Sequence, residues 1–141
     1  MRFFLSLSRI ANLDDMRDAA RRRLPKLAFD FFDGGADRES ALARNRAAFD
    51  ALTLTPRVLR NVSSRSIACE LFGRSWAAPL GIAPTGLANL ARGGADVMLA
   101  RAAAALDLPC VSSTASTTSI EAVGRAAPRH TWFQLYMPKD R

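Results

Sequence analysis

The chain has 141 residues, 49% of them hydrophobic, which is enough for a globular domain with its own core. Its 20 basic and 13 acidic residues give a net charge of +7, which suits an anionic small ligand, an anionic membrane surface or nucleic acid. No stretch approaches the roughly 20 consecutive apolar residues that span a bilayer.

The few cysteine and histidine residues argue against a metal site or a disulfide scaffold. Cys69 and Cys110 are far apart and form no CxxC motif, so we predict two buried, reduced thiols. His130 is the only histidine and has no second metal-binding side chain at a suitable spacing. We therefore interpret it as a structural or exposed residue, and we predict no metal site.

Residues 1–52 are predicted to be a short leader followed by three helices. The apolar run at the start is shorter than the core of a secretory signal, so residues 1–11 are interpreted as a leader or docking segment. Asn12 can cap a helix that begins at Leu13. Pro25 fits the first turn of a second helix that ends at Gly34-Gly35. A third helix is predicted over residues 37–52.

The densest positive charge falls at the end of the first predicted helix. Arg21, Arg22 and Arg23 are consecutive there, where cations complement the helix dipole. No aromatic-interleaved basic patch or RNA-binding motif accompanies them. Nucleic-acid binding is therefore only a minor alternative, and we predict no nucleic-acid partner.

The pattern changes after residue 52. Residues 54–62 and 67–72 alternate roughly between apolar and polar, which predicts two short strands or a hairpin. Residues 79–84 are almost continuously apolar, as in a strand buried on both faces. A helix over 95–106, a strand over 109–113, a helix over 119–126 and a strand over 131–136 follow.

This alternation of strands and helices predicts parallel strands joined by helical crossovers. No G-x-G-x-x-G turn follows the first strand, which disfavours a dinucleotide-binding start. Polar residues instead gather at the C-terminal ends of the strands, where barrel enzymes place their active sites. They are Thr85, the block from Ser112 to Ser116, Gln134 and Tyr136.

The predicted fold is therefore α/β, an incomplete TIM (β/α)8 barrel. Residues 12–78 form a helical and hairpin lead-in, and residues 79–141 form about three β/α units. A complete barrel needs about 250 residues. We therefore expect that the chain is cut off before the barrel closes.

Several short motifs occur in the order found in one enzyme family. They are Leu24-Pro25-Lys26, Phe29-Asp30-Phe31-Phe32, Gly34-Gly35-Ala36, Asn45-Arg46 with Phe49, Thr55-Pro56-Arg57-Val58-Leu59, Ala83-Pro84-Thr85-Gly86-Leu87, Ser112-Ser113-Thr114-Ala115-Ser116 and Phe133-Gln134-Leu135-Tyr136. Together they resemble the N-terminal portion of the FMN-dependent 2-hydroxy-acid dehydrogenases and oxidases. That family includes glycolate oxidase, L-lactate dehydrogenase and mandelate dehydrogenase.

The resemblance implies FMN as the cofactor, bound at the carboxyl ends of the strands. The residues that it assigns to FMN are Pro84, Thr85, Gly86, Ser112, Gln134 and Tyr136. It also places Tyr136 beside the substrate, and Phe31 where the family usually has a tyrosine that binds the substrate carboxylate. Phe31 cannot donate that hydrogen bond, which predicts weaker binding or a different substrate.

The family's catalytic histidine and substrate-binding arginines lie on later strands, so the resemblance implies no catalytic residue in this chain. His130 precedes the last strand and does not match the catalytic position. We expect the complete protein to oxidise an (S)-2-hydroxy acid of the lactate, glycolate or mandelate type to a 2-oxo acid, and the fragment to be inactive. The alternative is a truncated, non-catalytic product or an interaction module.

The resemblance also suggests where and in what form the complete protein works. It implies a homo-oligomer, a tetramer, in the cytoplasm, with peripheral association with the inner membrane as a further expectation. Its partner would be a small 2-hydroxy acid substrate.

Overall fold

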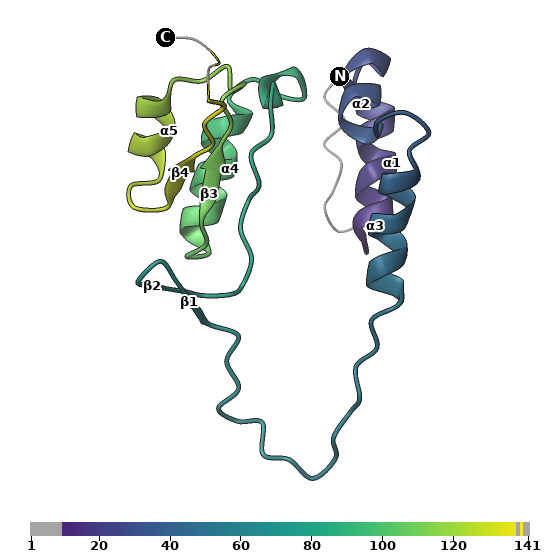
Figure 1. Cartoon of the computed structure of the whole chain (residues 1–141), viewed down its shortest axis with the longest axis vertical. Coiled ribbons are helices and arrows are strands. Elements are labelled where there is room, and N and C mark those ends of the chain that lie inside the picture. Colours follow the sequence, from purple (N-terminus) through teal and green to yellow (C-terminus); the bar gives the residue numbers. More distant parts are fainter. Residues whose placement is uncertain (1–9, 138, 140–141) are drawn as a thin grey trace. The chain divides into compact units, whose positions relative to one another are not determined.

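The computed structural model describes residues 10–137 and residue 139 (Figure 1). Most of the predicted leader therefore lies outside the described residues. The chain divides into two compact units, residues 1–60 and residues 61–141, and each is described by itself. Within the described residues, no helix is both long enough and apolar enough to cross a membrane.

The first unit contains the three predicted helices, α1 (Leu13–Arg23), α2 (Lys26–Asp33) and α3 (Ser40–Asp50). Asn12 caps α1 as predicted, since its Oδ1 accepts a hydrogen bond from the backbone N–H of Asp15 at 2.8 Å. Pro25 stands at the N-cap of α2, one residue before the predicted first-turn position.

The third helix is shorter than the predicted span of residues 37–52 and begins at Ser40. Asp37 and Glu39 have φ angles of 53° and 57°. These angles lie in the left-handed region, which a right-handed helix cannot include. The backbone before Ser40 therefore prevents the helix from starting earlier.

A bidentate ion pair joins α1 to α2. Arg17 Nε lies 2.5 Å from Asp33 Oδ1, and Arg17 Nη2 lies 2.8 Å from Asp33 Oδ2. The turn that ends α2 needs a residue without a side chain, because a Cβ on Gly34 would lie 2.8 Å from the carbonyl oxygen of Asp30. Of the two glycines predicted to end this helix, the first, Gly34, is therefore sterically required.

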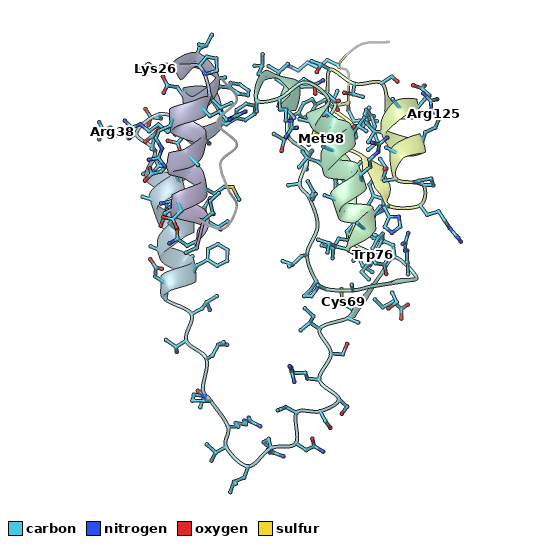
Figure 2. All side chains as sticks on the ribbon, turned by 180° about the vertical axis from the view of Figure 1, so that it is seen from behind. Lys26, Arg38, Cys69, Trp76, Met98 and Arg125 are labelled. Carbon is cyan, nitrogen blue, oxygen red and sulfur yellow. The ribbon has the colours of Figure 1, made fainter. Side chains whose placement is uncertain are left out.

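The prediction of a strand over residues 54–62 was wrong, because this segment has no regular structure. Leu54 and Leu59 are 96% and 102% exposed, and Figure 2 shows the side chains of the segment extending from an open loop. The apolar residues here resembled a strand, but no other strand among residues 10–137 pairs with them.

The predicted hairpin instead forms further along, from the antiparallel strands β1 (Cys69–Leu71) and β2 (Arg74–Trp76). Its two-residue loop is Phe72-Gly73, with φ angles of 53° and 70°. Positive φ at both positions is typical of a type I′ turn. The Phe72 ring packs edge-on against Trp132 at a centroid distance of 5.4 Å, a contact that favours this conformation.

Besides the hairpin, the second unit contains a parallel sheet of two strands, extended by one further segment. Strand β3 (Cys110–Ser112) lies between β4 (Thr131–Phe133) and the segment around Ile82, which forms a parallel bridge to Cys110. The predicted parallel order is thus confirmed, although β4 ends at Phe133 and not at residue 136.

The prediction that residues 79–84 are buried on both faces was wrong. Leu80 is 66% exposed, and only the bridge at Ile82 joins the segment to the sheet. Burial on both faces requires neighbours on both sides of a strand. This segment pairs with β3 alone, so its apolar composition is not matched by burial.

Both crossover helices, α4 (Ala95–Ala105) and α5 (Ile120–Ala126), pack on the same face of the sheet. The shared core is built from small side chains: Ala100, Ala103, Cys110, Val123 and Ala127. The side chain of Val111 contributes to the other face, where it lines an apolar groove of about 490 Å³ with Trp76, Ile82 and Trp132. The described residues thus form a partial α/β arrangement without a closed barrel, consistent with an incomplete barrel.

A polar cluster attaches the hairpin to the amino-terminal ends of the strands. Arg74 Nη2 and His130 Nε2 lie 2.9 Å and 3.0 Å from the same atom, Asp107 Oδ1. The Arg74 guanidinium also stacks over the Trp76 ring, 3.9 Å from its centroid. Asp107 precedes β3 and His130 precedes β4, so His130 lies at the end opposite to the predicted site, as its position in the sequence indicated.

Both cysteines have free thiols, as predicted. Cys110 is buried in the core, and burial raises the pKa of its thiol. Cys69 is only half-buried, so the prediction of two buried thiols was right for Cys110 alone.

The close approach of residues 79–84 to β3 depends on Gly81. A Cβ there would lie 3.0 Å from Pro109 Cγ and 3.2 Å from the Pro109 carbonyl oxygen. We expect Gly81→Ala to lower the free energy of unfolding by about 1–3 kcal/mol, because the two segments must separate. Gly93→Ala is the control, since a Cβ at Gly93 meets no atom within 4 Å. Equal urea-unfolding midpoints for the two variants would contradict this expectation.

The Asp107 cluster predicts a pH dependence of stability. The hydrogen bond from His130, and next that from Arg74, lowers the pKa of Asp107. A lowered pKa in the folded state stabilises the protein above the ordinary carboxyl value of about 4, and the effect is lost as the pH falls through the lowered pKa. We expect Asp107→Asn to lower the thermal midpoint at pH 7, and the difference from the unmodified chain to shrink as the pH falls below about 4. Asp18→Asn, in the exposed surface of α1, is the control; a difference for Asp107→Asn that persists unchanged in acid would contradict the assignment.

Candidate functional site

Three segments meet where the parallel strands end, and we call residues 83–87, 112–118 and 134–136 together the rim. The backbone N–H of Val111 donates to the Ile82 carbonyl, and that of Gln134 donates to the Ser112 carbonyl, each at 2.9 Å. A further bond, from the N–H of Leu87 to the Ala115 carbonyl at 3.0 Å, joins two of the loops. The rim is therefore held together by backbone hydrogen bonds across all three segments.

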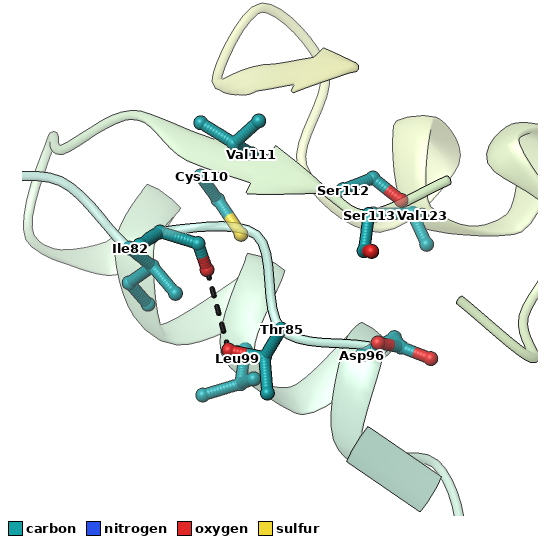
Figure 3. A pocket seen from close by; sticks show the side chains of 10 residues that line it. Ile82, Thr85, Asp96, Leu99, Cys110, Val111, Ser112, Ser113 and Val123 are labelled. Carbon is teal, nitrogen blue, oxygen red and sulfur yellow. Dashed lines mark hydrogen bonds between the residues drawn. The ribbon is translucent and has the colours of Figure 1, made fainter. Parts of the chain in front are cut away.

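Thr85 and Ser112, two of the predicted cofactor residues, line the same small hollow behind the rim (Figure 3). Asp96 and Leu99 of α4 and Val123 of α5 also line it. Its volume is about 10 Å³, the space of a single water molecule. The hollow is too small for a cofactor, so the side chains that line it support the rim and do not form a cofactor site.

Gly86 lies where two rim loops approach each other closely. A Cβ on Gly86 would lie 3.2 Å from the Ala115 Cβ and 3.9 Å from Ser113 Oγ. A larger side chain would push the loops apart, whereas glycine leaves the backbone accessible to a flat ligand. The neighbouring Thr85 hydroxyl donates to the Ala83 carbonyl at 3.4 Å, which stabilises the turn.

Gln134 is half-buried, and the loop after β3 holds its amide oxygen. Ser113 Oγ donates to Gln134 Oε1 at 3.2 Å, and the backbone N–H of Thr114 approaches the same oxygen at 3.4 Å. The Thr114 hydroxyl donates in turn to the Gln134 carbonyl and accepts from the N–H of Tyr136 at 3.3 Å. These contacts tie the last residues of the β4 segment to the β3 loop.

The remaining predicted residues are less enclosed. Pro84 is exposed and borders the apolar groove, and the Tyr136 side chain is 65% exposed. Phe31 belongs to the first unit, where it lies on α2 and packs edge-on against Phe32 at 5.1 Å. The structure thus brings Thr85, Gly86, Ser112, Gln134 and the backbone of Tyr136 to one end of the sheet, while their roles toward a cofactor stay predictions.

Sequence reasoning did not single out Ser113, Thr114 and Asp96. It assigned Ser112 alone from the polar block, yet Ser113 is the residue whose hydroxyl contacts Gln134. Both serines are buried and both line the small hollow, so residue type and burial do not distinguish the two hydroxyls. The block itself was the available signal, but only the position of the strand end shows which hydroxyl faces the rim.

The rim can bind and orient a ligand, but it has no side chain of the usual kinds that act as a general acid or base near neutral pH. Its residues include no histidine, carboxylate, lysine or arginine. They provide amide and hydroxyl groups that donate and accept hydrogen bonds. This set suits a planar, polar ring with both donors and acceptors on its edge.

Comparisons with known proteins agree in pointing to one family. The profile of a family described as FMN-dependent dehydrogenase matches residues 20–141. An L-lactate dehydrogenase of Xanthomonas campestris pv. campestris is 45% identical over 132 residues, which are 94% of this chain and 34% of that protein. An L-lactate dehydrogenase of Caulobacter sp. is 43% identical over the same share of this chain and 35% of its own length.

Solved structures give the same result. A soluble mutant of the membrane-associated (S)-mandelate dehydrogenase from Pseudomonas putida is 41% identical with a TM-score of 0.84, over 90% of this chain and 36% of that one. A Pediococcus acidilactici protein described as a putative lactate oxidase is 31% identical with a TM-score of 0.86, over 93% of this chain and 37% of that one. The chain therefore spans about a third of the length of the relatives that it matches.

Proposed function

The chain belongs to the FMN-dependent dehydrogenase family, and from this premise we propose that it forms the N-terminal part of a flavoenzyme that oxidises an (S)-2-hydroxy acid to a 2-oxo acid. The relatives named above include L-lactate dehydrogenases and an (S)-mandelate dehydrogenase. Lactate and mandelate are both 2-hydroxy acids, which supports that substrate class without choosing between them.

The fold that we propose for the whole protein is a TIM (β/α)8 barrel preceded by the helical and hairpin lead-in. The observation that supports it is that α4 and α5 share one core on one face of the sheet. A barrel places every crossover helix on its outer face, so two successive crossovers with helices on one face fit the start of a barrel. The apolar groove on the other face, lined by Val111, Trp132 and Ile82, would then be filled by side chains of further barrel strands.

The family's cofactor is FMN, and the rim residues fit it. The absence of a side chain at Gly86 would let the backbone of residues 84–86 run beside a flat ring system. The Gln134 amide would bind its polar edge. The role that the resemblance assigns to Ser112 would require its hydroxyl to turn away from the hollow behind the rim, which it lines here. FMN, when bound, takes up the electron pair that the substrate loses. The chain's own residues would hold and orient the cofactor and the substrate. Tyr136 would lie beside the substrate carboxylate or hydroxyl.

The residues that remove the substrate proton and bind its carboxylate would lie outside the third of the relatives' length that this chain matches. A positioned general base typically contributes about 10²–10⁴-fold to the rate, so the 141 residues alone should have no measurable turnover. For the complete protein we expect a cytoplasmic homo-oligomer with peripheral attachment to the inner membrane. The Pseudomonas putida relative, described as membrane-associated, supports the last point.

The decisive experiment replaces the matched 132 residues of the Xanthomonas L-lactate dehydrogenase with those of this chain. We expect the chimera to bind one FMN per subunit and to lose flavin absorbance when L-lactate is added without oxygen. Gln134→Ala should raise the FMN dissociation constant about tenfold or more, since one hydrogen-bonding side chain is lost. Leu135→Ala is the control on the same segment.

Two outcomes would contradict the proposal. A chimera that folds but binds no FMN would favour the alternative of a non-catalytic product or interaction module. Purified residues 1–141 that bind FMN stoichiometrically and reduce it with lactate, glycolate or mandelate would contradict the claim that essential groups lie elsewhere.

Phe31 provides a separate prediction about substrate binding. A tyrosine at this position could donate a hydrogen bond to the substrate carboxylate, which is typically worth about 1.5–3 kcal/mol. We therefore expect Phe31→Tyr in the chimera to lower KM for L-lactate about tenfold or more, with little change in kcat. Phe32→Tyr, at the adjacent ring, is the control. An unchanged KM in Phe31→Tyr would show that Phe31 is not at the carboxylate.

A further inference from the structure

Asp96 is a buried carboxylate in the first turn of α4, only 8% exposed. Its Oδ2 accepts hydrogen bonds from Ser116 Oγ and Thr118 Oγ1, each at 2.9 Å. A buried charge is costly unless its environment satisfies it, and hydrogen bonds to a charged acceptor are the strong ones. Since both donors lie on the rim loop after β3, the carboxylate holds that loop against the start of α4.

Asn89, just before α4, holds the same loop independently. Its Oδ1 accepts from the backbone N–H of Ala95 at 2.9 Å, and this N–H fixes which end of the amide is the oxygen. Its Nδ2 therefore faces the loop and donates to Thr117 Oγ1 at 2.7 Å and to Thr118 Oγ1 at 3.2 Å. Asp96 and Asn89 together restrain three consecutive hydroxyl residues, Ser116 to Thr118.

The loop transmits this restraint to Gln134. The N–H of Ser116 donates to the Ser113 carbonyl at 3.0 Å, which closes a tight turn. Ser113 Oγ accepts from the N–H of Ala115 at 3.1 Å, so its own hydrogen is free to point at Gln134 Oε1. The N–H of Thr114 can only donate, which also places the amide oxygen of Gln134 toward the loop. The amide NH₂ of Gln134 is consequently turned away from the loop.

We propose that Asp96 is a positioning residue of the cofactor site, which acts through Ser116 and Ser113 to fix the orientation of the Gln134 amide. With Asp96 in place, Gln134 presents its NH₂ group and therefore selects a hydrogen-bond acceptor on the ligand edge. This inference rests on the proposed function, since it takes Gln134 as a ligand of FMN. The contact path from Asp96 to Gln134 is a property of the chain itself and can be tested without a cofactor.

The first test uses NMR on the 141-residue chain labelled with ¹⁵N. In Asp96→Ala we expect amide exchange at Ser116 and Thr118 to accelerate about tenfold or more, and the side-chain NH₂ signals of Gln134 to shift. The amides of Cys110 and Val111 in the central strand should keep their exchange rates within about twofold. A purely structural loss of stability would instead accelerate all of these amides together.

Glu121→Ala is the matched control, because Glu121 is also an acid in the first turn of a helix but is exposed. It should leave the Gln134 side-chain signals unchanged. If Asp96→Ala does not fold, Asp96→Asn keeps the side-chain volume and should give the same local pattern with a smaller amplitude. Gln134 signals that do not respond to either Asp96 variant would overturn the proposal.

The second test measures FMN binding in the chimera that carries this chain. Asp96→Asn should raise the FMN dissociation constant about tenfold and shift the flavin absorption band, while Glu121→Gln should change neither. If the Gln134 signals respond to the Asp96 variants but FMN binding is unchanged, the positioning role of Asp96 toward the cofactor is overturned. If the unmodified chimera binds no FMN at all, the proposed function fails instead, and the NMR result still decides the link between Asp96 and Gln134.

Discussion

The pairing of β3 with a parallel neighbour on each side is the constraint on which the rest of the second unit depends. Two backbone hydrogen bonds of 2.9 Å, from Val111 to Ile82 and from Gln134 to Ser112, set the register of all three segments. Parallel strands in register end at the same edge of a sheet. Loops separated by almost 50 residues in the sequence, from Thr85 to Gln134, therefore become neighbours.

The division of side chains between the two faces follows from the same register. Cys110 lies among the alanines of α4 and the Val123 of α5, where small volumes allow the helices to approach the strands. Val111 lies on the opposite face with Trp132, where the described residues leave an apolar groove. A sheet with one apolar face uncovered and an unpaired edge is prone to association.

The sequence was a good guide where local chemistry decides the structure. Asn12 caps α1 as predicted, because capping uses a side chain and a backbone N–H only three residues away. The helix predicted over residues 119–126 begins one residue later, at Ile120, and Ser119 is its cap. It was a poor guide to the hairpin. The apolar pattern over residues 54–62 predicted a strand that has no pairing partner among the described residues, whereas the observed hairpin forms around the turn at Phe72-Gly73. It overstated the burial of residues 79–84, because burial is decided by neighbours that a strand's own residues do not specify.

The same distinction applies to the site. The polar block after β3 was visible in the sequence, and its position at a strand end followed from the alternation of elements. The partnership of Asp96 with Ser116 and Thr118 could not be predicted, because it joins residues about 20 positions apart through side-chain directions. Ser113 was missed for a related reason, since its contact with Gln134 joins residues 21 positions apart.

The position of His130 has a consequence for how the hairpin stays attached. Its Nδ1 lies 2.9 Å from the Pro128 carbonyl, which can only accept, so Nδ1 carries a hydrogen. Its Nε2 lies between Arg74 Nη2 at 2.9 Å and Asp107 Oδ1 at 3.0 Å. The imidazole therefore contacts both the hairpin, through Arg74, and the segment before β3, through Asp107. Because His130 itself directly precedes β4, one ring ties the hairpin to the starts of two neighbouring strands.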